Sequence, residues 1–183
     1  MCAVPRYIAF LRAVNVGGRF VRMAVLRDAL LDAGFTDVET HIQSGNVHVA
    51  TRRRSPEAVA REMCEVLSAC AGFDVPCVVR TPDSLTALVT RADDVAPLLP
   101  GGGKRYLALA DGEVPTEAAA TFAAWTTAGE RAVALPGAVL AELGKDFHRS
   151  TLTNARIERI TGLTTTWRDL DVVRTVAEKW SGR

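Results

Sequence analysis

The chain alternates between short apolar runs and segments whose apolar residues recur at helical spacing. Tyr7 to Leu11 is a continuous apolar run typical of a buried strand, and a helix is predicted from about Met23 to Ala33. Apolar and polar residues then alternate on both sides of Ser44-Gly45-Asn46, which predicts a β-hairpin with its turn at these residues. The chain therefore starts with the order β-α-β-β.

The next segment completes a first group of elements. Ser55 and Pro56 form a cap and first-turn pair for a helix that reaches Gly72. A strand is predicted from Asp74 to Arg80, and another helix from Thr81 to about Arg91. The first half is therefore predicted as βαββαβ with a trailing helix.

A break rich in proline and glycine, from Pro97 to Gly103, separates this half from a second one. After the break, strands are predicted at Lys104–Ala110, Arg131–Leu135, Ala138–Leu143 and Leu163–Trp167, and helices at Thr116–Trp125, Ser150–Thr161 and Asp169–Trp180. The same order of elements occurs twice. We therefore expect an α+β fold made of tandem duplicated ferredoxin-like (βαββαβ) subdomains with antiparallel sheets, at residues 1–92 and 104–183 with a linker at 93–103. The alternative is a single mixed sheet built from the same elements.

Composition limits the classes of partner. The formal net charge is +1, from 22 basic and 21 acidic residues, so the chain has no global field that would gather nucleic acid or anionic lipid. No apolar run approaches the roughly 18 residues of a membrane span, and the N-terminus lacks the pattern of a signal peptide. We expect a cytoplasmic protein without a membrane partner.

Metal-binding patterns are also missing from the sequence. The four cysteines, Cys2, Cys64, Cys70 and Cys77, contain no CxxC pair, so no structural zinc site is predicted. Cys64 and Cys70 fall on or near the apolar stripe of a helix and are expected to be buried thiols. His41 and His48 flank the predicted hairpin without a carboxylate or third histidine nearby, so we expect solvent-facing strand residues. No metal and no cofactor is predicted.

Three polar clusters stand where the hydrophobic pattern stops. They are Arg12, Asn15, Gly17 and Gly18; Gln43, Ser44, Gly45 and Asn46; and Arg149, Ser150, Thr153 and Asn154. Side chains at strand ends and helix starts are free to meet a ligand. These clusters offer hydrogen-bond donors and carboxamides rather than acids, bases or nucleophiles, which indicates binding more than reaction.

Each cluster also has a structural interpretation. Backbone N–H groups around Gly17 and Gly18, with Arg12, could hold an anion, but the same residues could merely form a turn. Turn chemistry explains the second cluster except for Gln43. Ser150 is a natural N-cap, which places Arg149 just outside a helix start; this could be an anion site or an ordinary cap with a surface arginine.

The segments LRAVNVGG, GFTDVETHIQSGNV and RSTLTNARIER resemble the bacterial family known as domain of unknown function 1697. The matched positions are Leu11, Arg12, Asn15, Val16, Gly17, Gly18, Gln43, Ser44, Gly45, Asn46, Arg149, Ser150, Leu152, Thr153, Asn154 and Glu158. The resemblance implies a pair of ferredoxin-like subdomains and brings no established activity. Ala13 and His41 depart from the family pattern. Near the C-terminus, Arg168 is retained from a TTRNW-like segment, whereas Asp169 and Leu170 replace its last two residues.

Together these features favour a binding protein for a phosphate-containing ligand, either a nucleotide or a nucleic-acid segment. The expected ligand residues, which we predict to meet near the junction of the subdomains, are Arg12, Asn15, Gly17, Gly18, Gln43, Ser44, Asn46, Arg149, Ser150, Asn154 and Arg168. One alternative is an enzyme acting on a phosphorylated metabolite, for which the motifs supply only Glu158 as an acid or base. The other is a purely structural role for the clusters. The sequence predicts no oligomeric state.

Overall fold

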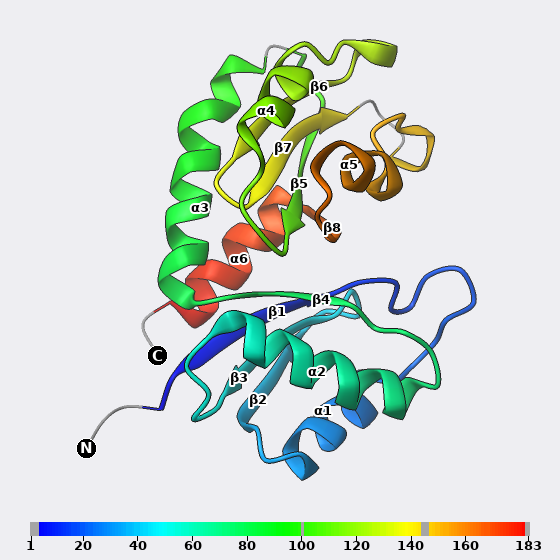
Figure 1. The fold of residues 1–183 in the computed structure, drawn as a ribbon, viewed down its shortest axis with the longest axis vertical. Helices are drawn as coiled ribbons and strands as arrows, with labels where there is room; N and C mark the ends of the chain where they lie inside the picture. Colours follow the sequence, from blue (N-terminus) through cyan, green and yellow to red (C-terminus); the bar gives the residue numbers. More distant parts are fainter. Residues whose placement is uncertain (1–3, 100, 144–146, 182–183) are drawn as a thin grey trace. The chain divides into compact units, whose positions relative to one another are not determined.

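The structure is a computed structural model that describes residues 4–99, 101–143 and 147–181. It is an α+β fold with two four-stranded antiparallel sheets and, within these ranges, six α-helices (Figure 1). The alternative of one mixed sheet is therefore wrong. Contacts divide the chain into two compact units, which we call unit 1 (Met1–Ser84 with Trp180–Arg183) and unit 2 (Leu85–Lys179). No helix in the described ranges is both long and apolar enough to cross a membrane.

Unit 1 contains one sheet and the helices α1 and α2. Its elements are β1 (Arg6–Leu11), α1 (Met23–Asp32), β2 (Thr36–His41), β3 (Asn46–Ala50), α2 (Pro56–Ala71) and β4 (Cys77–Arg80). The strand order is β2-β3-β1-β4, so β1 pairs with both β3 and β4. The end of β1 consequently lies beside the β2–β3 turn, because Phe10 is paired with Asn46.

The core of unit 1 forms where one face of the sheet meets the two helices. Tyr7, Ala9 and Leu11 alternate along β1 and are all buried in this core. The other main contributors are Leu26, Leu30, Val47, Val49, Val59, Met63, Leu67 and Val79. The helical spacing of the residues from α1 and α2 is the pattern that the sequence displays.

His48 on β3 departs from its expected position in solvent. Its side chain is only 1% exposed, and its ring lies 5.5 Å from that of Trp180. His48 Nδ1 is 3.0 Å from the Asp37 carbonyl oxygen, and Trp180 Nε1 donates a hydrogen bond to Glu39 at 3.1 Å. The prediction of a solvent-facing residue is wrong for His48 because Trp180, far away in the sequence, packs against it.

Unit 2 has the same strand arrangement. Its elements are β5 (Lys104–Ala110), α4 (Thr116–Ala123), β6 (Arg131–Leu135), β7 (Ala138–Leu143), α5 (Asn154–Thr161) and β8 (Thr165–Asp169), together with most of α3 (Pro82–Val95) and α6 (Leu170–Trp180). Short 3₁₀ turns lie at Ala96–Leu98, Thr127–Gly129 and Phe147–Arg149. The strand order is β6-β7-β5-β8, in which β5 takes the central place that β1 has in unit 1.

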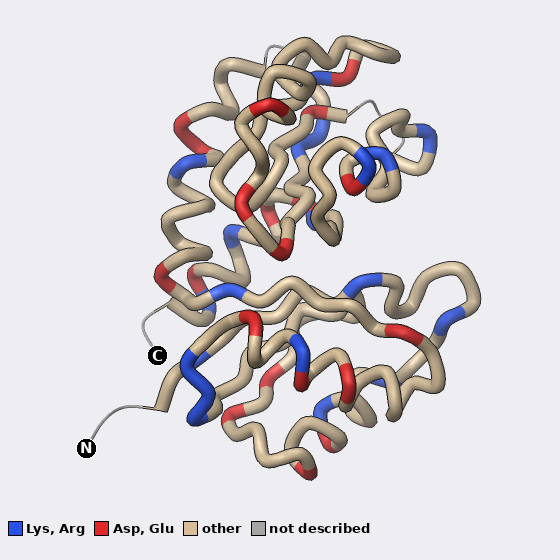
Figure 2. Tube along the Cα trace, viewed as in Figure 1, with Lys and Arg blue, Asp and Glu red and all other residues tan. Residues whose placement is uncertain are grey.

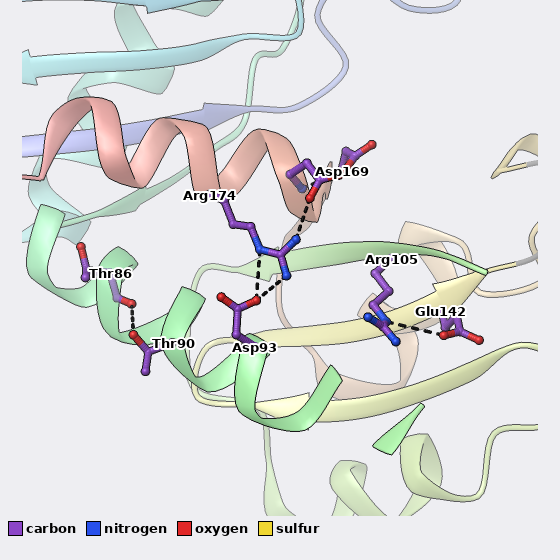
Figure 3. Close-up of polar contacts among 8 residues, drawn as sticks. Thr86, Thr90, Asp93, Arg105, Glu142, Asp169 and Arg174 are labelled. Atoms are coloured by element: carbon purple, nitrogen blue, oxygen red, sulfur yellow. Dashed lines mark hydrogen bonds and ion pairs between the residues drawn. The ribbon is translucent and has the colours of Figure 1, made fainter. Parts of the chain in front are cut away.

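Ion pairs connect elements of unit 2 that are distant in sequence. Arg174 on α6 bonds Asp93 on α3, with its Nε donating at 3.1 Å (Figure 3). Its Nη1 also donates to Asp171 at 2.6 Å. On the sheet, Arg105 Nε lies 3.6 Å from the buried carboxylate of Glu142 (Figure 3). The Arg174–Asp93 pair links α3 to α6, but it is exposed and contributes little stability by itself.

Candidate functional site

The first polar cluster lies in the loop between β1 and α1, and its glycines form a tight turn. The Asn15 N–H donates to the Arg19 carbonyl at 2.8 Å, and the Arg19 N–H donates to the Val16 carbonyl at 3.1 Å. Gly17 and Gly18 lie between these bonds with φ values of 59° and 83°, in the left-handed region that favours glycine. The two glycines therefore have a clear role in shaping the loop.

The Asn15 side chain fastens this loop to the second cluster. Its Nδ2 donates to the Gln43 carbonyl at 2.9 Å, and its Oδ1 accepts from the Val21 N–H at 3.0 Å. Unit 1 therefore brings the first two clusters together. The Asn15 carboxamide is engaged inside the protein.

The second cluster is a turn held against the end of β1. Asn46 is fully buried, and its Nδ2 donates to the His41 carbonyl at 3.0 Å and to Ser44 Oγ at 3.1 Å. The Gly45 carbonyl accepts from the Leu11 N–H at 2.8 Å. A Cβ at Gly45 would lie 2.8 Å from the Leu11 Cβ, so the turn requires glycine at this position.

Other side chains of these two clusters, and of the loop around them, are at least partly exposed to solvent. Gln43 is exposed and Arg12 is half-buried. Phe20, in the β1–α1 loop, is 77% exposed. The Arg19 guanidinium lies over the Phe73 ring, 5.5 Å from its centroid. The exposed chemistry in this part of unit 1 is therefore that of arginine, glutamine and apolar groups.

The third cluster, in unit 2, is arranged differently from the prediction. Helix α5 begins at Asn154, and its N-cap is Thr153, whose Oγ accepts from the Arg156 N–H at 3.3 Å. The predicted helix start at Ser150 is therefore wrong. Ser150 Oγ instead accepts from the Leu152 N–H at 3.1 Å, within the turn that precedes the helix. The exposed Arg149 ends a 3₁₀ turn just before it.

Two motif residues of α5 connect this helix to β8. The Asn154 Oδ1 accepts from Thr165 Oγ at 3.1 Å, and the Glu158 Oε1 accepts from the Thr165 N–H at 3.0 Å. Thr165 is fully buried. The single acidic residue of the motifs is thus a hydrogen-bond acceptor for the backbone of β8.

Glu130 is a buried polar residue that lies outside the three polar clusters. It is 2% exposed, and its carboxylate accepts from the Thr151 N–H at 3.0 Å, Thr151 Oγ at 2.6 Å and Trp125 Nε1 at 3.3 Å. Burial raises its pKa, but hydrogen bonds from Thr151, Ser150 and Trp125 outweigh this effect and hold the pKa below the usual value of 4.5. No sequence motif surrounds Glu130, and Thr151, which donates two of these hydrogen bonds, lies 21 residues away.

A cavity of about 350 Å³ opens beside the start of α5. It is lined by Ser150, Thr151, Thr153, Ala155, Arg156 and Arg159. Arg156 is held by a hydrogen bond from its Nη1 to the Thr151 carbonyl at 3.2 Å, and its guanidinium lies 5.4 Å from the centre of the Trp125 ring. Figure 2 shows the basic positions of α5 in blue. The cavity therefore combines hydroxyl groups, a helix N-terminus and arginines.

Arg168 lies on β8 and is buried. It is 8% exposed, and its Nη1 donates to Thr166 Oγ at 3.0 Å and to the Trp167 carbonyl at 2.7 Å. Burial lowers its pKa to about 10. Arg168 thus has internal partners on its own strand. That all the clusters meet in one place stays a prediction.

Unit 1 contains a second cavity, which has charged residues in its lining. A cavity of about 560 Å³ in unit 1 is lined in part by Arg52, Arg53 and Glu62. Arg53 and Glu62 form an ion pair there, with Arg53 Nη2 donating at 2.6 Å, so much of the local charge is neutralised. Across the described ranges, no group of three or more His, Cys, Asp or Glu residues could hold a metal ion.

Comparisons with known proteins agree with the motifs. The structure of the conserved bacterial protein SP0830 from Streptococcus pneumoniae is similar to this one with a TM-score of 0.71 and 18% sequence identity, covering 97% of this chain and 98% of that chain. At this identity the likeness concerns the fold. No curated protein matches the chain. The sequence profile of the proteins of unknown function DUF1697 matches residues 4–140, which include the first two clusters. The chain therefore belongs to the DUF1697 family.

Proposed function

We propose that the protein binds a phosphate-containing ligand and that the cavity beside α5 is the binding site. The observation that carries this proposal is the lining of the cavity, in which Arg156 and Arg159 stand beside three residues with hydroxyl groups. Arg149 is exposed just before this segment and can add a third guanidinium. Arginine binds phosphate oxygens through charge-assisted hydrogen bonds, often two at a time.

The surroundings of the cavity favour an anion in two further ways. Thr153 already accepts the Arg156 N–H as the N-cap of α5, and the helix dipole favours negative charge near this helix start. Arg156 is held in place by the Thr151 carbonyl and the Trp125 ring, so less side-chain entropy is lost on binding. The site is small, and the net charge of the chain is +1. Both facts favour one nucleotide-sized ligand over a long stretch of nucleic acid.

We propose a mainly structural role for the polar residues of unit 1. Asn15 and Asn46 have their carboxamides engaged in internal hydrogen bonds, and Gly45 is required by its close approach to Leu11. Arg12 and Gln43 remain the residues of these clusters with side chains suited to a ligand. Binding is favoured over catalysis because two carboxylates that contact this part of unit 2, Glu130 and Glu158, serve as hydrogen-bond acceptors for backbone N–H groups.

We also propose that the two units are duplicated copies of a ferredoxin-like fold, with the repeats at residues 1–92 and 104–183. Two observations support this proposal. The strand orders β2-β3-β1-β4 and β6-β7-β5-β8 are equivalent, and each sheet is assembled from elements in the same sequence, β-α-β-β-α-β.

The binding proposal is tested by calorimetric titration with inorganic phosphate and with adenosine monophosphate. We expect binding to the parent protein, and an affinity for the same ligand about tenfold or more lower in Arg159→Gln, because a hydrogen bond to a charged group contributes about 1.5–3 kcal/mol. Arg61→Gln is the matched control, since Arg61 is an exposed arginine on the surface of α2. Absence of binding by either ligand, or equal weakening in both variants, would contradict the proposal.

A further inference from the structure

Two cysteines of unit 1 lie side by side. Cys64 is on α2 and Cys77 is the first residue of β4, and their Sγ atoms are 3.3 Å apart. Both thiols are free. Cys64 is half-buried, whereas Cys77 is only 6% exposed. Cys64 is therefore the more solvent-accessible residue of the pair, and Cys77 lies next to it in the protein interior.

The packing of unit 1 fixes this arrangement. Cys77 is paired with Leu11 in the β1–β4 ladder, and its Sγ lies 3.5 Å from the Ala60 carbonyl oxygen. Cys77 belongs to the buried core, and Cys64 packs against that core. The short distance between the sulfurs is therefore a consequence of how α2 packs on the sheet.

We propose that Cys64 and Cys77 form a thiol–disulfide exchange site whose substrate is a low-molecular-weight disulfide of the glutathione disulfide type. The Cys64 thiolate attacks one sulfur of the small disulfide, which forms a mixed disulfide and releases one small thiolate. That thiolate or solvent takes the Cys77 proton, and Cys77 then attacks Cys64 Sγ and releases the second thiol. The protein dithiol is oxidised to a disulfide, and the small disulfide is reduced to two thiols.

The geometry suits this reaction. A disulfide bond is about 2.05 Å long, so the two sulfurs, now 3.3 Å apart, must approach each other by about 1.3 Å. The hydrogen bond with Cys77 lowers the pKa of Cys64 to about 7, against the effect of burial. The same hydrogen bond and burial raise the pKa of Cys77. Cys64 is thus suited to attack first, and Cys77 to resolve the mixed disulfide.

Cys70 provides a control on the same helix. It is also half-buried, and its Sγ lies 3.9 Å from the Val25 carbonyl oxygen. It is therefore also partly accessible to solvent but has a different neighbour. A difference in reactivity between Cys64 and Cys70 would arise from the pairing with Cys77 rather than from access alone.

The test uses the full chain in a Cys2→Ser background, because Cys2 lies outside the described residues. The folded protein is incubated with glutathione disulfide, the remaining thiols are alkylated, and the products are mapped by mass spectrometry. We expect loss of two hydrogen atoms and a Cys64–Cys77 linkage, formed severalfold faster than any adduct on Cys70. Cys70→Ser should react like the parent, whereas Cys77→Ala should stop at a glutathione adduct on Cys64.

If a variant fails to fold, the mapping of modified cysteines in the parent protein is sufficient to test the proposal. Equal rates of modification at Cys64 and Cys70, with no linkage between Cys64 and Cys77, would overturn the proposal. So would a linkage that forms only after the protein is unfolded by denaturant.

Discussion

At the scale of single residues, the asparagines of the family motifs act within the protein. Asn15 bridges two loops, Asn46 holds the β2–β3 turn, and Asn154 accepts a hydrogen bond from Thr165. A carboxamide is suited to these places because it carries both donors and acceptors. The sequence motifs contain these asparagines, but their spacing fits a ligand-binding role as well as a structural one. Only the positions of their partners assign them an internal role.

Replacing Asn46 with alanine tests this role. We expect Asn46→Ala to lower the free energy of unfolding by about 1–3 kcal/mol, because the fully buried Asn46 side chain is the donor to the His41 carbonyl and to the Ser44 hydroxyl. Gln43→Ala is the matched control in the same turn, since its side chain is exposed, and it should change stability by about 0.5 kcal/mol or less. Denaturant unfolding measures both. Equal effects would show that Asn46 does not hold the turn.

Glu130 leads to a prediction about pH. Its pKa in the folded protein lies below 4.5, so the stability from its charged form is present above that value and is lost as the pH falls through the folded pKa. Glu130→Gln should therefore cost about 1–3 kcal/mol at neutral pH. The difference from the parent should shrink as the pH falls below 4.5. Denaturant unfolding over a pH series measures it, and a difference that stays constant in acid would contradict the prediction.

At the scale of elements, the sequence predicts strands well where turn residues separate them. Pro136-Gly137 delimits β6 and β7, and both strands have their predicted bounds. By contrast, β4 begins at Cys77 rather than Asp74, since Pro76 has no N–H for the ladder. The predicted start of α5 at Ser150 is wrong because Ser150 and Thr153 are both good N-caps. Contacts of Thr151 with Glu130 keep the first of these outside the helix.

The β2–β3 turn gives a prediction at this scale. Gly45→Ala should destabilise the protein by more than about 2 kcal/mol, because it combines a φ of +77° with a Cβ placed 2.8 Å from Leu11 Cβ. Gly18→Ala is the control, since Gly18 has a φ of +83° but no atom within 4 Å of the added Cβ. It should cost about 1 kcal/mol. Thermal or denaturant unfolding distinguishes the two, and similar losses would contradict the crowding at Gly45.

At the scale of the whole molecule, the chain forms two units whose sheets have equivalent strand order. The repeated periodicity made two sheets predictable, because each half carries its own alternation of strand and helix patterns. The packing of Trp180 on His48 was not predictable, since no local pattern relates the last helix to β3. The buried position of Glu130 was missed for the same reason. The cytoplasmic location stays a prediction.

The proposal that a phosphate-containing ligand binds in the α5 cavity can be tested by mapping backbone amide chemical shifts by NMR. Adenosine monophosphate is titrated into the full chain, so every part of the molecule is observed in one experiment. We predict that the largest shifts fall within residues 149–159, around the arginines and hydroxyl groups that line the cavity. Shifts confined to residues 12–22 and 43–46, or no saturable shifts, would contradict the claim.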